Sequence, residues 1–126
     1  MKIELDSIAD HINRIDAYSI GQVTVAGTVY KSSLLVSRDI VVPDWPPQRF
    51  ADLTLRHVEQ ITALDPEIVI LGTGNLLTFP SELLLSPITE RAIGLEIMDT
   101  GAACRTYNFL IAEGRNVVAA LLMMEA

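Results

Sequence analysis

Hydrophobic positions along the chain follow two different periods, and this predicts an α/β protein. Val23 and Val25 alternate with Thr24 before Ala26-Gly27, and a run rich in β-branched residues follows from Thr28 to Val36. That pattern is typical of a β-hairpin, in which Thr28 to Val36 forms the second strand. Ile40 to Val42 predicts a third short strand, which the prolines that follow end because proline cannot donate to a ladder.

The first twenty residues carry a mixed signal. Ile8, Ile12 and Ile15 have helical spacing, but the Asp and Asn residues between them favour turns and caps. We expect this stretch to be irregular or an edge strand.

Beyond the prolines the period becomes helical. Thr54 is a candidate N-cap, and the apolar residues that follow it line one side of a helix that Asp65-Pro66 ends. Ile68 to Leu71 is a continuous apolar run leading into Gly72-Thr73-Gly74, which predicts a strand buried on both faces.

The last third continues the alternation. Pro80 and Pro87 bracket a short or broken helix, and Ser86-Pro87 resembles an N-cap followed by an N1 proline. The remaining expected elements are a buried strand, a helix that Gly114 caps, and a last strand, over residues 93–98, 99–113 and 117–122. Such alternation predicts a sheet with helices on its faces and the hairpin extending or flanking it, in one domain over residues 1–126.

Composition narrows the function classes. The chain has 126 residues, 50% of them apolar, and a net charge of −7. This is too apolar for a disordered chain, and it is enough to suspect a further interface. The acidic charge argues against nucleic-acid partners, since it repels phosphate backbones.

Cellular location is read from cysteine usage and from the start of the chain. Cys104 is the one cysteine, so no intramolecular disulfide is possible, and the separated histidines predict no zinc site. No apolar run approaches the roughly 20 residues of a membrane span. The start resembles neither a secretory signal nor an Arg-rich transit peptide. We therefore expect a cytoplasmic protein without membrane insertion, metal or cofactor.

The run from Glu96 to Asn108, which contains Cys-Arg-Thr-Tyr-Asn, resembles the signature of one family, as does its continuation from Glu113 to Leu122. Further resembling features lie at residues 18–36, 41–45 and 71–74. The family is a bacterial and archaeal domain of unknown function that includes the mitochondrial respiratory complex I assembly factor three. The resemblance implies a three-layer sandwich with a mixed central sheet and no agreed catalytic residues. It also implies a role in binding partner proteins, since the mitochondrial member acts in that way.

The turn Gly72-Thr73-Gly74 and the helix start from Thr100 to Thr106 form one candidate ligand site. Ligands of open α/β sheets bind beyond the carboxyl ends of strands, where glycines let the backbone approach an anion. The motif falls short of a dinucleotide fingerprint or a P-loop, and the simpler interpretation is a tight turn. Asp99 and Thr100 are preferred helix caps, and we favour that role over catalysis.

Within the same helix, Cys104 has two interpretations. A helix N-terminus and the adjacent Arg105 favour a reactive thiolate. Tyr107 and Ile111 lie on the same stripe, however, and favour a buried, structural cysteine, which we prefer. Arg105 and Thr106 either bind an anion or bond to nearby strand-end carbonyls.

Two aromatic residues are candidates for a protein interface. Phe109 lies on a helix that is apolar nearly all round, so part of its burial could come from another chain. Trp45 could be an exposed anchor, although such a tryptophan more often covers the edge of a core.

Two functions follow. The first is a protein-binding or assembly-type module without catalysis. The alternative is a small-ligand or anion-binding protein, or an enzyme, with a pocket between residues 72–74 and 100–106. Formation of a homo-oligomer is a third explanation of the apolar excess.

Overall fold

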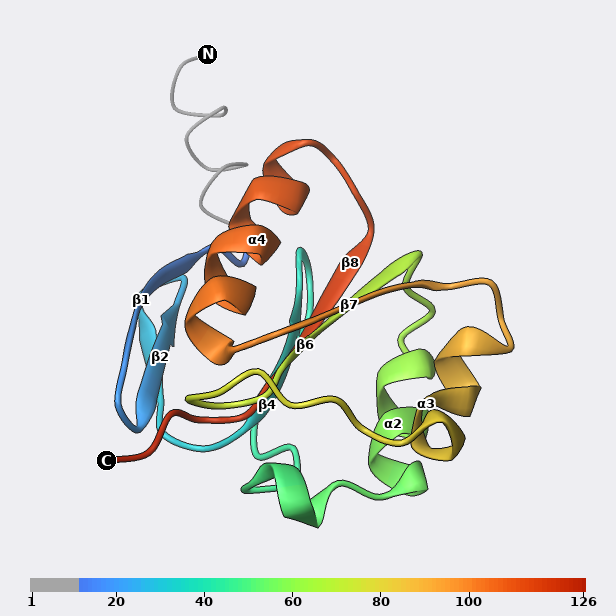
Figure 1. Ribbon diagram of the computed structural model, residues 1–126. Helices are drawn as coiled ribbons and strands as arrows, with labels where there is room; N and C mark the ends of the chain where they lie inside the picture. Colours follow the sequence, from blue (N-terminus) through green and yellow to red (C-terminus); the bar gives the residue numbers. More distant parts are fainter. Residues whose placement is uncertain (1–11) are drawn as a thin grey trace.

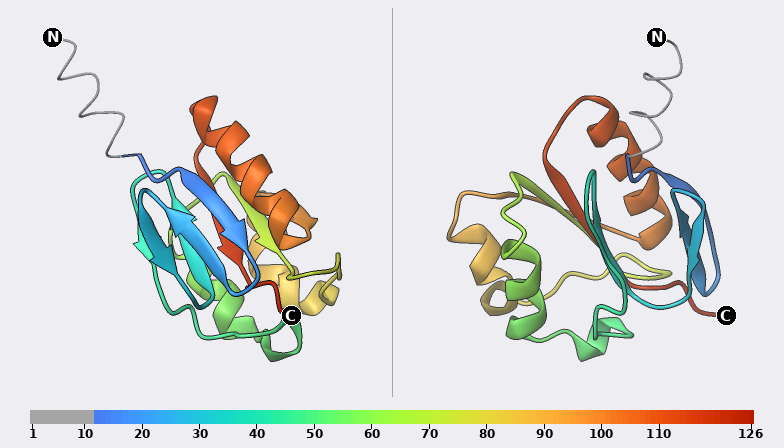
Figure 2. Two further views of the ribbon diagram at one scale, coloured as in Figure 1. Left: turned by 90° about the vertical axis from the view of Figure 1, so that its left-hand side faces the viewer. Right: turned by 180° about the vertical axis from the view of Figure 1, so that it is seen from behind.

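The computed structural model describes residues 12–126 and shows a three-layer α/β fold, as predicted (Figure 1). A central five-stranded sheet has the order β5-β4-β8-β6-β7. Its parallel strands are β6 (Ile68–Gly72), β7 (Gly94–Met98) and β8 (Val117–Leu121), and β4 (Leu34–Ser37) and β5 (Val41–Val42) complete it in antiparallel fashion. Helix α4 (Thr100–Ala112) covers one face, and helices α2 (Leu55–Thr62) and α3 (Glu82–Thr89) cover the other (Figure 2).

A second, three-stranded antiparallel sheet lies beside α4 and contains β1 (Ile15–Ser19), β2 (Gln22–Val25) and β3 (Thr28–Tyr30). Strand β1 confirms the expected edge strand, while Ile8 lies outside the described residues. The hairpin turn is confirmed as well: Ala26 and Gly27 have φ of 47° and 85°, as a type I′ turn requires.

The expected second hairpin strand, Thr28 to Val36, is wrong in its extent. Residues 31–33 interrupt it, and β4 leaves the small sheet for the central one, where it pairs with β8. Leu34, Leu35 and Val36 are each at most 1% exposed. Three consecutive buried side chains need cover on both faces of a sheet, which the central sheet provides.

Helix α3 begins earlier than predicted, because Ser86-Pro87 is not its N-terminus. Ser81 is the N-cap of α3, its Oγ accepting from the Leu84 N–H at 3.2 Å, and Pro87 lies inside the helix. By contrast Thr54 and Asp99 cap α2 and α4 as predicted.

The predicted burial of the strand over residues 93–98 is wrong. Strand β7 is at the edge of the central sheet, and its residues are half-buried or exposed. Strand β8, the last in the sequence, is instead central and buried at every position. Because side chains alternate along β8, one set packs under α4 and the small sheet, and the other under α2 and α3.

Candidate functional site

The carboxyl ends of β6 and β8 meet the start of α4 through the hydroxyl of Thr100. Its Oγ1 accepts from the Gly74 N–H at 2.8 Å and donates to the Leu122 carbonyl at 2.6 Å. The Thr100 N–H in turn donates to the Gly74 carbonyl at 2.9 Å. The predicted turn and helix start do come together, but they satisfy each other's polar groups.

Gly72 allows this close approach. A Cβ at this position would lie 3.1 Å from Ala103 Cβ, from Leu121 Cδ2 and from Thr100 Cα. Helix α4 therefore rests on the backbone of β6, and the Gly72 glycine serves packing. Gly74 has φ of 92°, a conformation that glycine adopts without strain.

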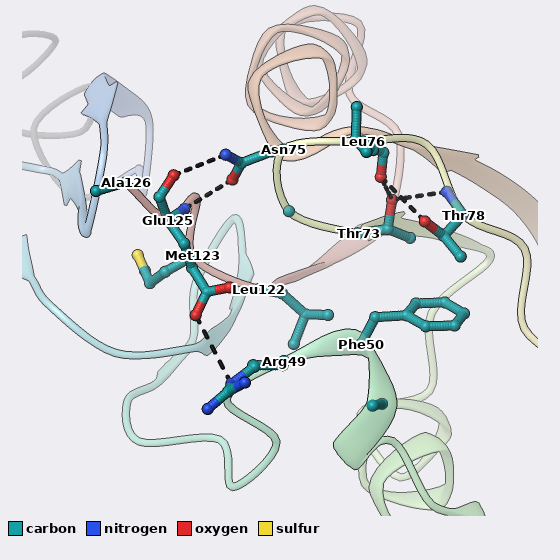
Figure 3. A pocket seen from close by; sticks show the side chains of 12 residues that line it. Arg49, Phe50, Thr73, Asn75, Leu76, Thr78, Leu122, Met123, Glu125 and Ala126 are labelled. Carbon is teal, nitrogen blue, oxygen red and sulfur yellow. Dashed lines mark hydrogen bonds and ion pairs between the residues drawn. The ribbon is translucent and has the colours of Figure 1, made fainter.

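Thr73 organises the loop that follows β6. Its hydroxyl donates to the Leu76 carbonyl at 2.6 Å and accepts from the Thr78 N–H at 3.2 Å (Figure 3). The backbone between residues 73 and 78 is thereby fixed in one shape.

Beside this loop lies a pocket of about 450 Å³, at the carboxyl ends of β6 and β8 (Figure 3). Of the candidate ligand residues, Thr73 and Gly74 line it, whereas Gly72, Thr100, Cys104, Arg105 and Thr106 do not. The other lining residues are Arg49, Phe50, Ala51, Asn75, Leu76, Thr78, Leu122, Met123, Glu125 and Ala126. No sequence motif marks Arg49 or Asn75; the location beyond parallel strand ends is the signal that could have found them.

The pocket's polar groups hold the segment after β8. The Asn75 amide donates to the Glu125 carbonyl and accepts from the Glu125 N–H, both at 2.7 Å. Arg49 Nε lies 3.8 Å from Glu125 Oε2, and both side chains are more than half exposed. Such an exposed ion pair contributes little, about 0–1 kcal/mol, so Arg49 is free to exchange Glu125 for another anion.

Cys104 is buried at 1% exposure. Burial raises the pKa of its thiol to about 12, against a smaller opposing effect of Arg105. The thiol is therefore protonated at neutral pH, which argues against the nucleophilic interpretation and for packing.

The neighbours of Cys104 connect α4 to the small sheet. The Arg105 guanidinium donates to the Tyr18 hydroxyl, and its Cζ lies 5.9 Å from the centre of that ring. The Tyr107 hydroxyl donates to the Asn13 carbonyl at 2.6 Å. The Arg-Thr-Tyr-Asn run thus docks α4 against β1, and Arg105 points toward β1 rather than into the pocket. Thr106 is half-buried on another side of α4.

The two interface candidates differ in exposure. Trp45 is 1% exposed, packs edge-on against His57 and donates from Nε1 to the His57 carbonyl at 3.3 Å. The exposed-anchor interpretation is corrected accordingly, because the indole lies in the core. Phe109 is 63% exposed on α4.

No sequence motif marks a run of exposed apolar residues that follows β6. Leu76, Leu77, Phe79 and Leu83 are 76%, 52%, 66% and 77% exposed within eight positions, between β6 and the first turn of α3. We call residues 76–83 the apolar segment.

Residues 12–126 contain no group of three His, Cys, Asp or Glu side chains that could hold a metal ion. Over the same residues no helix is both long and apolar enough to cross a bilayer.

The fold and pocket define a class: a small three-layer α/β domain with a mixed sheet and a shallow pocket at its strand ends. Within that class, the chain belongs to the family described as protein of unknown function DUF498/DUF598, whose model matches residues 15–122. The family resemblance seen in the sequence is confirmed.

Two solved structures are similar to this chain in both fold and sequence. A crystal structure of a Bordetella parapertussis protein has a TM-score of 0.83 and 37% identity, covering 89% of this chain and 96% of that one. A solution structure from Bordetella pertussis, described as an Mth938-like domain, has a TM-score of 0.81 and 30% identity. That match covers 90% of this chain and 87% of the Bordetella chain.

The mouse NADH dehydrogenase (ubiquinone) 1 alpha subcomplex assembly factor 3 is 35% identical over 111 residues. The match takes in 86% of this chain but only 59% of the mouse protein, so the chain spans little more than half of that relative.

Proposed function

We propose that the protein is a non-catalytic module that binds another protein during assembly of a complex, and that the apolar segment is its contact surface. The observation that carries this proposal is the exposure of Leu76, Leu77, Phe79 and Leu83, each more than half open to solvent. Exposed apolar surface marks interaction sites in small proteins, and these four side chains lie within one run of eight residues.

The energetics favour a protein contact. Burial of a leucine or phenylalanine side chain contributes about 1.5–3 kcal/mol, so these residues together offset a large part of the entropic cost of association. Thr73 fixes the backbone at the start of the segment, and Ser81 caps α3 near its end. A fixed loop loses little conformational entropy on binding, which improves affinity.

The relatives support the same class of function. The mouse relative is named an assembly factor of NADH dehydrogenase. By analogy, the partner is a subunit of a multi-subunit complex or another protein that assists its assembly. Burial of the Cys104 thiol argues only against this residue as a nucleophile.

The test is photo-crosslinking in cells of the native host, with a photoreactive amino acid in place of Leu77. Variants Leu76→Ser and Leu83→Ser should each weaken capture of the same specific protein, because they remove apolar contact area. Ile20→Ser is the matched control, since Ile20 is also exposed, at 61%, but lies in the β1–β2 turn. Equal capture by all three variants would rule the segment out as the contact surface.

A second candidate function is binding of a small organic anion in the pocket of about 450 Å³. The weakly held Arg49 favours it, because a ligand carboxylate could replace that of Glu125. A screen of small carboxylates and phosphates by NMR tests it: shifts at Thr73, Gly74 and Asn75 that vanish in Arg49→Ala would support a ligand-binding role. Shifts that survive this substitution, or none at all, would count against it.

A further inference from the structure

We infer that β7 is a self-association edge, through which two copies of the chain join their central sheets by antiparallel β7–β7 pairing. The inference concerns a different surface from the apolar segment and does not depend on it. Four observations support it. The backbone of β7 has open hydrogen-bonding groups, and the other described sheet edges are short or covered. Glu96 makes no ion pair within the described residues, and a pocket beside β7 contains Arg115.

The outer edge of β7 has backbone groups to offer. The Gly94 N–H donates to Glu67 and the Met98 carbonyl accepts from Thr73, both at 2.9 Å, so alternate residues from 94 to 98 face β6. In an extended strand the residues between them point the opposite way. The N–H and C=O groups of Leu95 and Ile97 therefore face outward, where residues 12–126 supply no further strand.

The other described edges are short or covered. Strand β5 has two residues and Pro43 follows it, and β3 has three residues. At β1 the Asn108 amide takes up both backbone groups of Ile15. Proteins protect sheet edges in such ways because open edges pair with other chains. Strand β7 is five residues long, carries no proline, and has no comparable cover among residues 12–126.

Glu96 sets the register of the pairing. It lies on the α4 face of β7 and makes no ion pair within the described residues. A two-fold axis at Glu96 would place two carboxylates opposite each other, which is destabilising. An axis at Leu95 instead places each Glu96 opposite Gly94 of the second copy, where no side chain stands in its way.

In this register the carboxylate also meets a cation. Gly94, Phe109 and Arg115 together line a pocket of about 430 Å³ between α4 and β7. Arg115 already pairs with Glu67 at the start of β6, its Nε lying 3.4 Å from Glu67 Oε1, but its side chain is 44% exposed, so the pair is weak and a second carboxylate can approach. Glu96 of the second copy, opposite Gly94, would stand beside this pocket, whose lining also includes the chain's own Glu96. The charges complement each other twice, once on each side of the axis.

Sedimentation equilibrium on the whole chain, with a matched pair of substitutions, tests this arrangement. A Cβ at Gly94 would make only ordinary contacts, the nearest at 3.5 Å to Ile68, so the fold accepts a side chain there. We expect a wild-type dimer whose Kd rises about tenfold in Gly94→Glu and falls about threefold in Gly94→Lys, because each new charge faces Glu96.

Disulfide trapping tests the register. A mixture of Gly94→Cys and Glu96→Cys chains should form a cross-linked heterodimer faster than either chain cross-links with itself, since opposed Cα atoms in such pairs lie about 4.5 Å apart. The proposal is overturned by a chain that stays monomeric at several hundred micromolar, by equal shifts in the two Gly94 variants, or by preferential cross-linking of identical chains.

Discussion

The side-chain amide of Asn108 pairs with both backbone groups of Ile15: its Nδ2 donates to the carbonyl at 2.8 Å, and its Oδ1 accepts from the N–H at 2.9 Å. An amide on α4 thus completes the free edge of β1. Together with Arg105 and Tyr107, this contact gives the Cys-Arg-Thr-Tyr-Asn signature a structural meaning, because it holds the small sheet against the helix.

Asn108→Ala should destabilise the protein by about 1–3 kcal/mol, because the Ile15 backbone groups lose their partners in a largely buried place. Asn75→Ala is a matched control: its amide makes the same double contact, with Glu125, but at the exposed surface where water can replace it. We expect less than about 1 kcal/mol there. Urea unfolding of both variants measures the difference, and equal losses would contradict a special role for the β1 contact.

Thr100→Val should cost about 1–3 kcal/mol, because it leaves the Gly74 N–H and the Leu122 carbonyl unpaired at a site of 0% exposure. Thr100→Ser keeps the hydroxyl and loses only a methyl group, so about 1 kcal/mol is expected. Thermal unfolding compares the two. If Val proves the milder change, the hydroxyl does not hold the strand ends together.

Gly72→Ala should destabilise the fold by about 1–3 kcal/mol, since the new methyl group would press on α4 and on Leu121 at 3.1 Å. Gly94→Ala, on the neighbouring strand, meets only contacts of 3.5 Å or longer and should stay within about 0.5 kcal/mol. Chemical denaturation at low chain concentration tests this pair. A neutral Gly72→Ala would show that α4 can move away from β6.

Alkaline pH should weaken the fold through Cys104 and Tyr107. Burial raises the pKa of the Cys104 thiol from 9.0 to about 12, and it raises the pKa of the Tyr107 hydroxyl as well. The unfolded chain then ionises first, so the stability present below pH 9 is lost as pH rises toward 12. One such group gives a slope of at most roughly 1.4 kcal/mol per pH unit.

Urea midpoints from about pH 8 to about pH 11 measure this loss, and Cys104→Ala should flatten it. Alkylation is an independent check: iodoacetamide should modify Cys104 only when the chain unfolds. Fast modification of the native protein would contradict the buried thiol.

Local signals predicted much of this fold. Residue type and position identify Thr54 and Asp99 as caps. The Ala26-Gly27 turn is identified by its place between an alternating run and a run rich in β-branched residues. These features depend on neighbours in sequence, so a single sequence carries them. The start of α3 is not predicted correctly, because Ser86-Pro87 has the residue types of an N-cap and first turn, whereas Ser81 is the actual N-cap.

Non-local features were harder to predict. The apolar residues of β4 and β7 look alike, yet β4 is central and β7 lies at an edge, which only the order of strands decides. The same holds for the pocket. Arg49 and Asn75 lie far apart in sequence and meet because the loop after β6 and the segment after β8 leave the sheet side by side. The turn at Gly72–Gly74 does indicate the end of the sheet where the pocket lies. Its own backbone groups, however, pack against α4 and bond to Thr100.

The central position of β8 has a consequence for biosynthesis. Leu34 in β4 pairs with Leu121 in β8, and β8 also separates β4 from β6. A growing chain can pair β4 with β5 and β6 with β7, but these two pairs of strands are not joined in one sheet until β8 has been made. Because the joining strand is made last, its contacts are distant in sequence, which slows folding and exposes unpaired edges meanwhile. The central sheet therefore cannot close before β8 is made, and a chain cut before residue 117 would lack the strand that joins β4 to β6.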